Sequence, residues 1–192
     1  MTPWTEYASI VALGIGANSE NLPVGLGYGM QGRKIGLASN LFIAAVTTGA
    51  TLVPLAIGER LRGYMPERWP DIIGGLLLIL LGFFNVWFDR RRQPSFHFKS
   101  EPLRTTTISL GETVVLAGSL SLNNVGLGFA GGIAGLGAGP VAVSVSGFCI
   151  VLLWLGQHLG HAIGVRSHAL RWLLLDGNVL IVAAGLAMVI AA

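Results

Sequence analysis

Two short clusters of polar residues interrupt the apolar stretches of this 192-residue chain. The first reads Asn18-Ser-Glu-Asn21, and the second reads Ser121-Leu-Asn-Asn124. Amide oxygens and a carboxylate together form a hard, oxygen-rich ligand set, which suits Mg²⁺, Ca²⁺ or Mn²⁺ better than soft metals. The sequence therefore predicts a cation site whose ligands are Glu20, Asn18, Asn21, Asn123 and Asn124.

Pro23 indicates that the backbone around the first cluster is distorted. Proline has no N–H, and its ring clashes with the carbonyl four residues back, which here belongs to Ser19. We expect a kink over residues 19–23 and a released carbonyl, which is tolerated at membrane depth where it lines a wet or liganded cavity. The alternative is that the Asn amides only hold helices together by hydrogen bonds. That explains isolated Asn residues well, but less well a Glu flanked by Asn.

Four further polar residues are secondary candidates for the site: Thr47, Thr48, Ser121 and Glu112. The hydroxyls could complete a coordination shell, although a hydroxyl bonded back to its own helix is the commoner arrangement. Glu112 fits a capping box with Ser109. It precedes Asn123 by 11 residues, about 16 Å along a regular helix, so only an entrance role is open to it.

Histidine and cysteine contribute little to the predicted site. His158 and His161 are three residues apart on one helical face, but they lie near the end of an apolar segment, and we interpret them as interfacial. Cys149 is the single cysteine, and a small buried hydrophobic residue is the expected role for it. The sequence contains no recognisable hydrolase motif, phosphate-binding loop or Cys/His cluster, so no enzyme activity and no resident cofactor are predicted.

The elements that must carry these residues are membrane spans. Only 11% of residues are charged, 53% are hydrophobic and the mean hydropathy is +0.69, whereas soluble domains are usually about 25% charged. This composition excludes a disordered protein and argues against an ordinary soluble domain. Apolar stretches of about 20 residues predict helices that cross the membrane. Six are expected, over residues 8–30, 36–57, 70–88, 107–131, 140–161 and 171–191.

The basic residues predict the orientation of these spans. Loops one, three and five carry nine Lys and Arg residues (Arg33, Lys34, Arg90, Arg91, Arg92, Lys99, Arg104, Arg166 and Arg171), whereas loop two carries three (Arg60, Arg62 and Arg68). Basic loops stay in the cytoplasm, so both termini are predicted outside. The sequence pI near 9.5 is explained by this asymmetry, and nucleic acid is not an expected partner.

The two polar clusters indicate an internal duplication of the chain. Asn21-x3-Gly25-x3-Gly29 recurs as Asn124-x3-Gly128-x3-Gly132, at an offset of 103 residues, and the apolar segment from Gly74 recurs from Gly177 at the same offset. Between them, Thr48-Gly49-x8-Gly58 recurs as Ser146-Gly147-x8-Gly156, at an offset of 98. An odd number of spans per copy places the second copy upside down in the membrane, as in many secondary transporters.

The predicted fold is therefore an all-α membrane protein of six transmembrane helices, arranged as two inverted three-helix repeats. The first repeat covers residues 1–92, a cytoplasmic linker covers 93–106, and the second repeat covers 107–192. Small residues at four-residue steps allow close approach of helix backbones. We call the two Asn-x3-Gly-x3-Gly patterns glycine ladders, and we expect them to pack the first and fourth spans against each other. Their glycines are Gly25, Gly29, Gly128 and Gly132.

The two signatures resemble those of the MntP family. The matching segments are Ala17-Asn-Ser-Glu-Asn-Leu-Pro-Val-Gly-Leu-Gly-Tyr-Gly29 and Leu120-Ser-Leu-Asn-Asn-Val-Gly-Leu-Gly128. The resemblance implies a six-span bacterial manganese exporter with duplicated halves, and the Asn-rich signature is similar to the YtaF branch of sporulation-associated membrane proteins. MntP exporters typically carry Asp in each signature, where this chain has Glu20 and Asn123. These exporters also typically carry an acidic residue in the second span, and the corresponding position in this chain is near Ala50, which is apolar.

The main hypothesis is a multi-pass transporter of the bacterial plasma membrane that exports a divalent cation, Mn²⁺ by resemblance, through alternating access. Mn²⁺ would be the substrate and membrane lipid the surrounding partner; the oligomeric state is left open. One alternative is a non-transporting membrane protein of the YtaF kind, which acts in envelope or spore assembly. Another is a small-metabolite exporter on a related six-helix fold, because the site is more neutral than a metal site usually is.

Overall fold

The computed structural model describes residues 3–66, 69–70, 72–74, 76–77, 79–81, 83 and 107–163. Over these residues the chain is helical, with one isolated bridge between Lys34 and Thr107 and no strand. The helices in chain order are α1 (Pro3–Ala17), α2 (Asn21–Met30), α3 (Leu37–Arg62), α5 (Leu110–Ile133) and α6 (Ala138–Ile163). The expectation of an all-α protein is confirmed for this part of the chain.

Three of these helices, α3, α5 and α6, are each long and apolar enough to cross a membrane. They correspond to the segments predicted at 36–57, 107–131 and 140–161, so the chain is a membrane protein by these spans. The described residues between 69 and 83 are also helical, with a shorter apolar helix over Ile72–Leu81. The predicted sixth span, the linker over 93–106 and the end of the third span lie outside the described residues.

The first predicted span is two helices instead of one continuous helix. The chain turns at residues 18–20, between α1 and α2, which together cover the predicted segment and extend it back to Pro3. Asn21 N–H bonds to the carbonyl of Asn18, only three residues back, and Pro23 has no N–H to donate to Ser19. The predicted distortion next to Pro23 is confirmed, and it is a full break in the helix.

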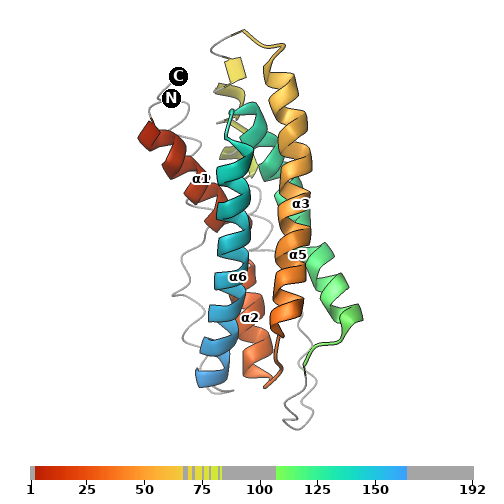
Figure 1. Cartoon of the computed structure of the whole chain (residues 1–192). Coiled ribbons are helices and arrows are strands. Elements are labelled where there is room, and N and C mark those ends of the chain that lie inside the picture. Colours follow the sequence, from red (N-terminus) through yellow and green to blue (C-terminus); the bar gives the residue numbers. More distant parts are fainter. Residues whose placement is uncertain are drawn as a thin grey trace.

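Close pairs of parallel helices form the bundle (Figure 1), and glycines make the approach possible. A Cβ atom added at Gly128 or Gly132 would stand 2.1 Å from the carbonyl oxygen of Thr51 or Leu55 on α3. On the other pair, a Cβ added at Gly25 or Gly29 would stand 2.4 or 2.1 Å from a backbone oxygen of α6. The expected pairing of the first span with the fourth is therefore wrong. The glycines of α5 instead face the backbone of α3, and the glycines of α2 face the backbone of α6.

The two pairs have matching contacts. Gly25 and Gly128, 103 residues apart, face the carbonyls of Leu153 and Thr51, which are 102 residues apart. Gly58 faces Phe129 on one pair, and Gly160 faces Leu26 on the other, again at offsets of 102 and 103. The contacts therefore make Gly160 the equivalent of Gly58, 102 residues away. The sequence pattern had paired Gly58 with Gly156, 98 residues away, and this pairing is wrong.

Helices α3 and α6 lie side by side and run in opposite directions, which joins the two pairs into one bundle (Figure 1). Two apolar clusters fill it. One contains Leu13, Leu55 and Leu127, and the other contains Ile43, Leu120 and Leu153, all at 5% exposure or less. The second polar cluster lies between the two apolar clusters along α5, and Thr47, Thr48 and Thr51 lie between them along α3.

Candidate functional site

Glu20 and Asn123 meet across the bundle. Asn123 Nδ2 donates a hydrogen bond to Glu20 Oε1. Glu20 occupies the turn between α1 and α2, whereas Asn123 projects from the middle of the continuous helix α5. Both residues are partly exposed. The expected proximity of the two polar clusters is confirmed by this contact, and it joins positions that are 103 residues apart.

The side chain of Asn18 makes hydrogen bonds to residues on both sides of the turn between α1 and α2, and to α6. Its amide Nδ2 donates to Gly14 O at 2.8 Å and to Val145 O of α6 at 3.0 Å. Its Oδ1 accepts a hydrogen bond from Asn21 Nδ2 at 3.0 Å. Asn18 and Asn21 are each only 1% exposed. The oxygen of Asn18 is therefore already engaged, and this residue fixes the backbone on which Glu20 stands.

Asn124 brings an amide oxygen that has no partner in the described structure. The side chain is fully buried, and its Nδ2 donates to Thr47 O of α3 at 3.3 Å, while Oδ1 has no hydrogen-bond partner. The Thr47 hydroxyl lies 3.6 Å from Cys149 Sγ on α6. Asn21, at the same place in the first cluster, begins α2, which packs against α6. Asn21 beside α6 and Asn124 beside α3 thus occupy matching places in the two helix pairs.

The candidate hydroxyls are used within their own helices. Thr47 Oγ1 donates to Ile43 O at 2.9 Å, and Ser121 Oγ donates to Ala117 O at 2.8 Å. Both follow the commoner arrangement in which the hydroxyl bonds a carbonyl one turn back. Thr48 differs, because its Oγ1 is buried without a partner in the described residues.

Asn40 is a buried polar residue that the sequence analysis missed. It lies on α3 at 5% exposure, and its Nδ2 donates to Ile150 O of α6 at 3.1 Å. Its Oδ1 has no partner in the described part of the chain. The signal was available, because an amide side chain within an apolar span is costly wherever it occurs, but Asn40 lies outside the two polar clusters and only Ser39 is polar beside it.

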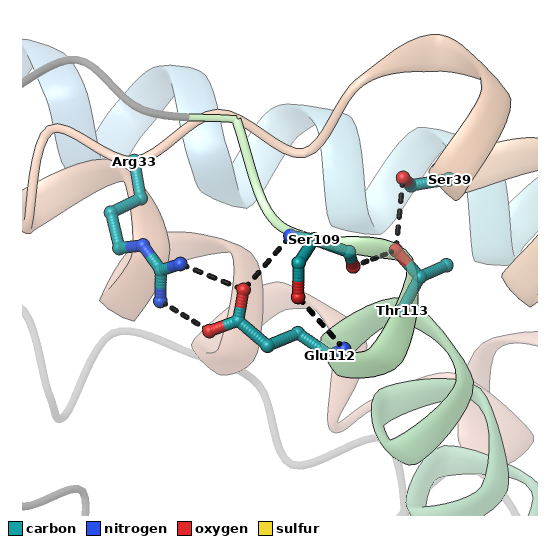
Figure 2. A network of polar contacts seen from close by, with 5 residues as sticks. All are labelled: Arg33, Ser39, Ser109, Glu112 and Thr113. Carbon is teal, nitrogen blue, oxygen red and sulfur yellow. Dashed lines mark hydrogen bonds and ion pairs between the residues drawn. The ribbon is translucent and has the colours of Figure 1, made fainter.

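Glu112 forms an ion pair with Arg33 in the first turn of α5 (Figure 2), whereas Asn123 lies in the middle of that helix. Its two carboxylate oxygens accept hydrogen bonds from Nη1 and Nη2 of Arg33, both at 2.8 Å. Glu112 also completes the predicted capping box with Ser109. Hydrogen bonding to Glu112 raises the pKa of the Arg33 guanidinium. Such bidentate pairs between Arg and a carboxylate are geometrically specific.

Further hydrogen bonds join the two halves of the chain around this ion pair. Ile108 N donates to Lys34 O at 3.0 Å, and Thr113 Oγ1 donates to Ser39 Oγ at 3.0 Å (Figure 2). Ile35 N donates to the side-chain oxygen of Gln157 on α6 at 2.7 Å. The loop after α2, the start of α5 and the last turns of α6 therefore share one end of the bundle. The sequence pattern had predicted that these segments lie on the same side of the membrane.

The arrangement offers one carboxylate and several amide oxygens near the helix break. Among the described residues, no group of three or more His, Cys, Asp or Glu side chains could hold a metal. A cation here would depend on Glu20 for charge and on neutral oxygens, such as those of Asn123 and Asn124, for the rest of its shell. Hard divalent cations accept such oxygen ligands together with water.

Comparisons with known proteins agree with the resemblance of the signatures. The chain is 21% identical over 182 residues to the probable sporulation protein YtaF of Bacillus subtilis, with 81% of this chain and 87% of that protein covered. It is 31% identical over 78 residues to the putative manganese efflux pump MntP of Dehalococcoides mccartyi, with 41% and 39% covered. The second match thus spans about two fifths of that relative. No protein-family profile and no solved structure matches the chain.

Proposed function

We propose that this protein is a membrane transporter that exports a divalent cation, with Mn²⁺ as the leading candidate. The observation that carries the proposal is the contact between Glu20, at a break in the first span, and Asn123, in the middle of α5. An ionisable residue within membrane spans that faces another helix is the usual sign of an ion pathway. The similarity to a protein named as a manganese efflux pump supports the same substrate.

Glu20 supplies the anionic ligand, and it takes up a proton when the cation leaves. Asn123 and Asn124 supply neutral oxygens, and Asn124 Oδ1, which has no partner among the described residues, favours a direct role. Asn18 and Asn21 hold the turn between α1 and α2 in place through their mutual hydrogen bond. Because that bond uses Asn18 Oδ1, this oxygen is not assigned to the cation. This division of roles narrows the five ligands expected from the sequence to Glu20, Asn123 and Asn124.

Transport proceeds by alternating access of two inverted halves. Two observations support this. Helices α3 and α6, the second spans of the two halves, run antiparallel (Figure 1), and equivalent glycines make equivalent contacts in both halves. The end held by Arg33 and Glu112 faces the cytoplasm in the proposed topology, since the basic loops lie there. In the state seen here that end is joined by the ion pair.

The test is manganese resistance in a bacterial host that lacks its own exporter. We compare the wild type with Glu20→Gln, which keeps the shape of the side chain and removes its charge, and with Glu59→Gln as a matched control on an exposed residue of α3. We expect resistance from the wild type and the control, and none from Glu20→Gln. Equal resistance from all three excludes Glu20 as the ligand, and no resistance from the wild type refutes the manganese assignment.

A second candidate is a non-transporting membrane protein involved in sporulation or envelope assembly. It is favoured by the neutral Asn123 at the place where exporters resembling this chain carry an acid, and by the wider coverage of the YtaF relative. Purified protein in liposomes separates the two. A transporter gives Mn²⁺ flux that depends on Glu20, whereas the second candidate gives none with any of Mn²⁺, Cd²⁺ or amino acids.

A further inference from the structure

A basic pocket lies at the end of the bundle where α2 and α6 finish. It is lined by Arg33, Lys34, Gln157, His158 and His161. Each of these side chains can donate hydrogen bonds from nitrogen, and none is an acid. The charge of Arg33 is offset by Glu112, but Lys34 is exposed and makes no ion pair with the described residues. The pocket therefore has the chemistry of an anion site.

Neighbouring contacts hold two of these side chains in place. The Oε1 atom of Gln157 accepts a hydrogen bond from Ile35 N at 2.7 Å, so the NH₂ group is the remaining end of this amide. His158 Nδ1 contacts Trp154 O at 2.8 Å, and its ring packs against the Trp154 indole in a tilted arrangement, with centroids 4.2 Å apart and an angle of 38° between the planes. The pocket wall is thus partly ordered without a ligand, which lowers the entropic cost of binding.

An exposed apolar stripe on α6 leads directly to this pocket. Val151, Trp154 and Leu155 are 53%, 54% and 37% exposed, and with His158 they follow the spacing of one helix face. Tryptophan is enriched at the level of the lipid headgroups. The stripe lies on a helix long enough to cross the membrane. A ligand with a charged head and an apolar tail fits the pocket and the stripe together better than a free anion does.

We propose that this pocket binds the phosphate of an anionic lipid headgroup, with an acyl chain of the lipid along Val151 and Leu155. Basic pockets between transmembrane helices on the cytoplasmic side are suited to such headgroups. Lys34 supplies the charge, and His161 and Gln157 donate hydrogen bonds to phosphate oxygens. The proposal does not depend on what the protein transports, or on whether it transports at all.

The test is native mass spectrometry of the full-length protein in detergent, titrated with phosphatidylglycerol, phosphatidylcholine or inorganic phosphate. Wild type is compared with Lys34→Gln and His161→Leu, which change exposed residues of the pocket. The control is Arg60→Gln, which removes the same charge in the last turn of α3, at the end of that helix away from the pocket. We expect phosphatidylglycerol to bind in preference to phosphatidylcholine. Lys34→Gln should weaken it about fivefold, the fold-change that corresponds to ~1 kcal/mol for one lysine near an anionic surface.

The outcomes separate a specific site from general attraction. Weakened phosphatidylglycerol binding in Lys34→Gln and His161→Leu, with Arg60→Gln unchanged, supports the proposal. An equal loss in Lys34→Gln and Arg60→Gln overturns it, because net charge alone would then explain the binding. Equal binding of both lipids overturns it as well, and so does a Lys34-dependent site for inorganic phosphate without preference for phosphatidylglycerol, since the ligand would then be a free anion.

Discussion

Replacing Gly128 by alanine should force α5 away from α3 and destabilise the bundle. The added Cβ would stand 2.1 Å from Thr51 O, whereas comfortable contacts between carbon and a carbonyl oxygen begin at about 3.3 Å. The helices must separate locally by roughly 1.2 Å to restore that contact. Overpacking of this kind typically costs ~1–3 kcal/mol, and we expect a value of ~2 kcal/mol because the atom met is backbone and cannot rotate away.

Gly118 is the matched control on the same helix. It is exposed, and a Cβ added there meets no atom of the described residues within 4 Å. Gly118→Ala should therefore stabilise the protein by about 0.5–1 kcal/mol, through the higher helix propensity of alanine. The two variants carry the same chemical change on one helix, so they isolate the effect of the close approach to α3.

Unfolding of the detergent-solubilised protein by increasing SDS, followed by circular dichroism, measures both free energies. Gly128→Ala should shift the midpoint down and Gly118→Ala should shift it up. The separation should also stretch the bond of 3.3 Å between Asn124 Nδ2 and Thr47 O, one turn away, and so impair any function that requires Asn124. Equal midpoints for the two variants would refute the reasoning, because they would show that the helices do not approach each other this closely.

Three further changes test the polar contacts. Asn18→Leu should destabilise the protein by about 2 kcal/mol more than Asn124→Leu in the same SDS titration, since each lost bond with a buried partner costs about 1 kcal/mol. Within the described part of the chain, Asn18 makes three side-chain hydrogen bonds, whereas Asn124 makes one and its oxygen has no partner. A double-mutant cycle with Arg33→Gln and Glu112→Gln should give a coupling of about 1 kcal/mol that weakens at high salt, and a coupling near zero would show that the ion pair contributes nothing. Asn123→Asp places a second carboxylate beside the first, so Mn²⁺ binding measured by isothermal titration calorimetry should tighten at least tenfold relative to wild type, since opposite charges attract strongly at low dielectric.

The helical architecture was largely predictable, because apolar stretches of span length carry a strong signal. The three spans over α3, α5 and α6 were located to within a few residues at most ends. The break between α1 and α2 followed from Pro23 and its missing N–H. The ends of the first span were less predictable, since Pro3 begins a helix that residues 3–7 continue without a strongly apolar composition.

The pairing of helices could not be predicted, because small residues indicate close approach without naming the partner. The ladder at Gly25 was expected to face the fourth span, but it faces the carbonyl of Leu153 on α6. The candidate site was predictable in its position but not in the role of each residue. The repeat placed Glu20 opposite Asn123, whereas nothing in the letters distinguished Asn18, whose oxygen is occupied, from Asn124, whose oxygen is not.

The break in the first helix makes the two halves mechanically unlike. The residue that matches Pro23 at the offset of 103 is Gly126, and it lies inside α5, which continues unbroken from Leu110 to Ile133. Glu20 therefore stands on a turn between two helices, whereas Asn123 stands within one uninterrupted helix. Any movement of Glu20 relative to Asn123, which it contacts here, has to be taken up at this turn, because α5 has no comparable break.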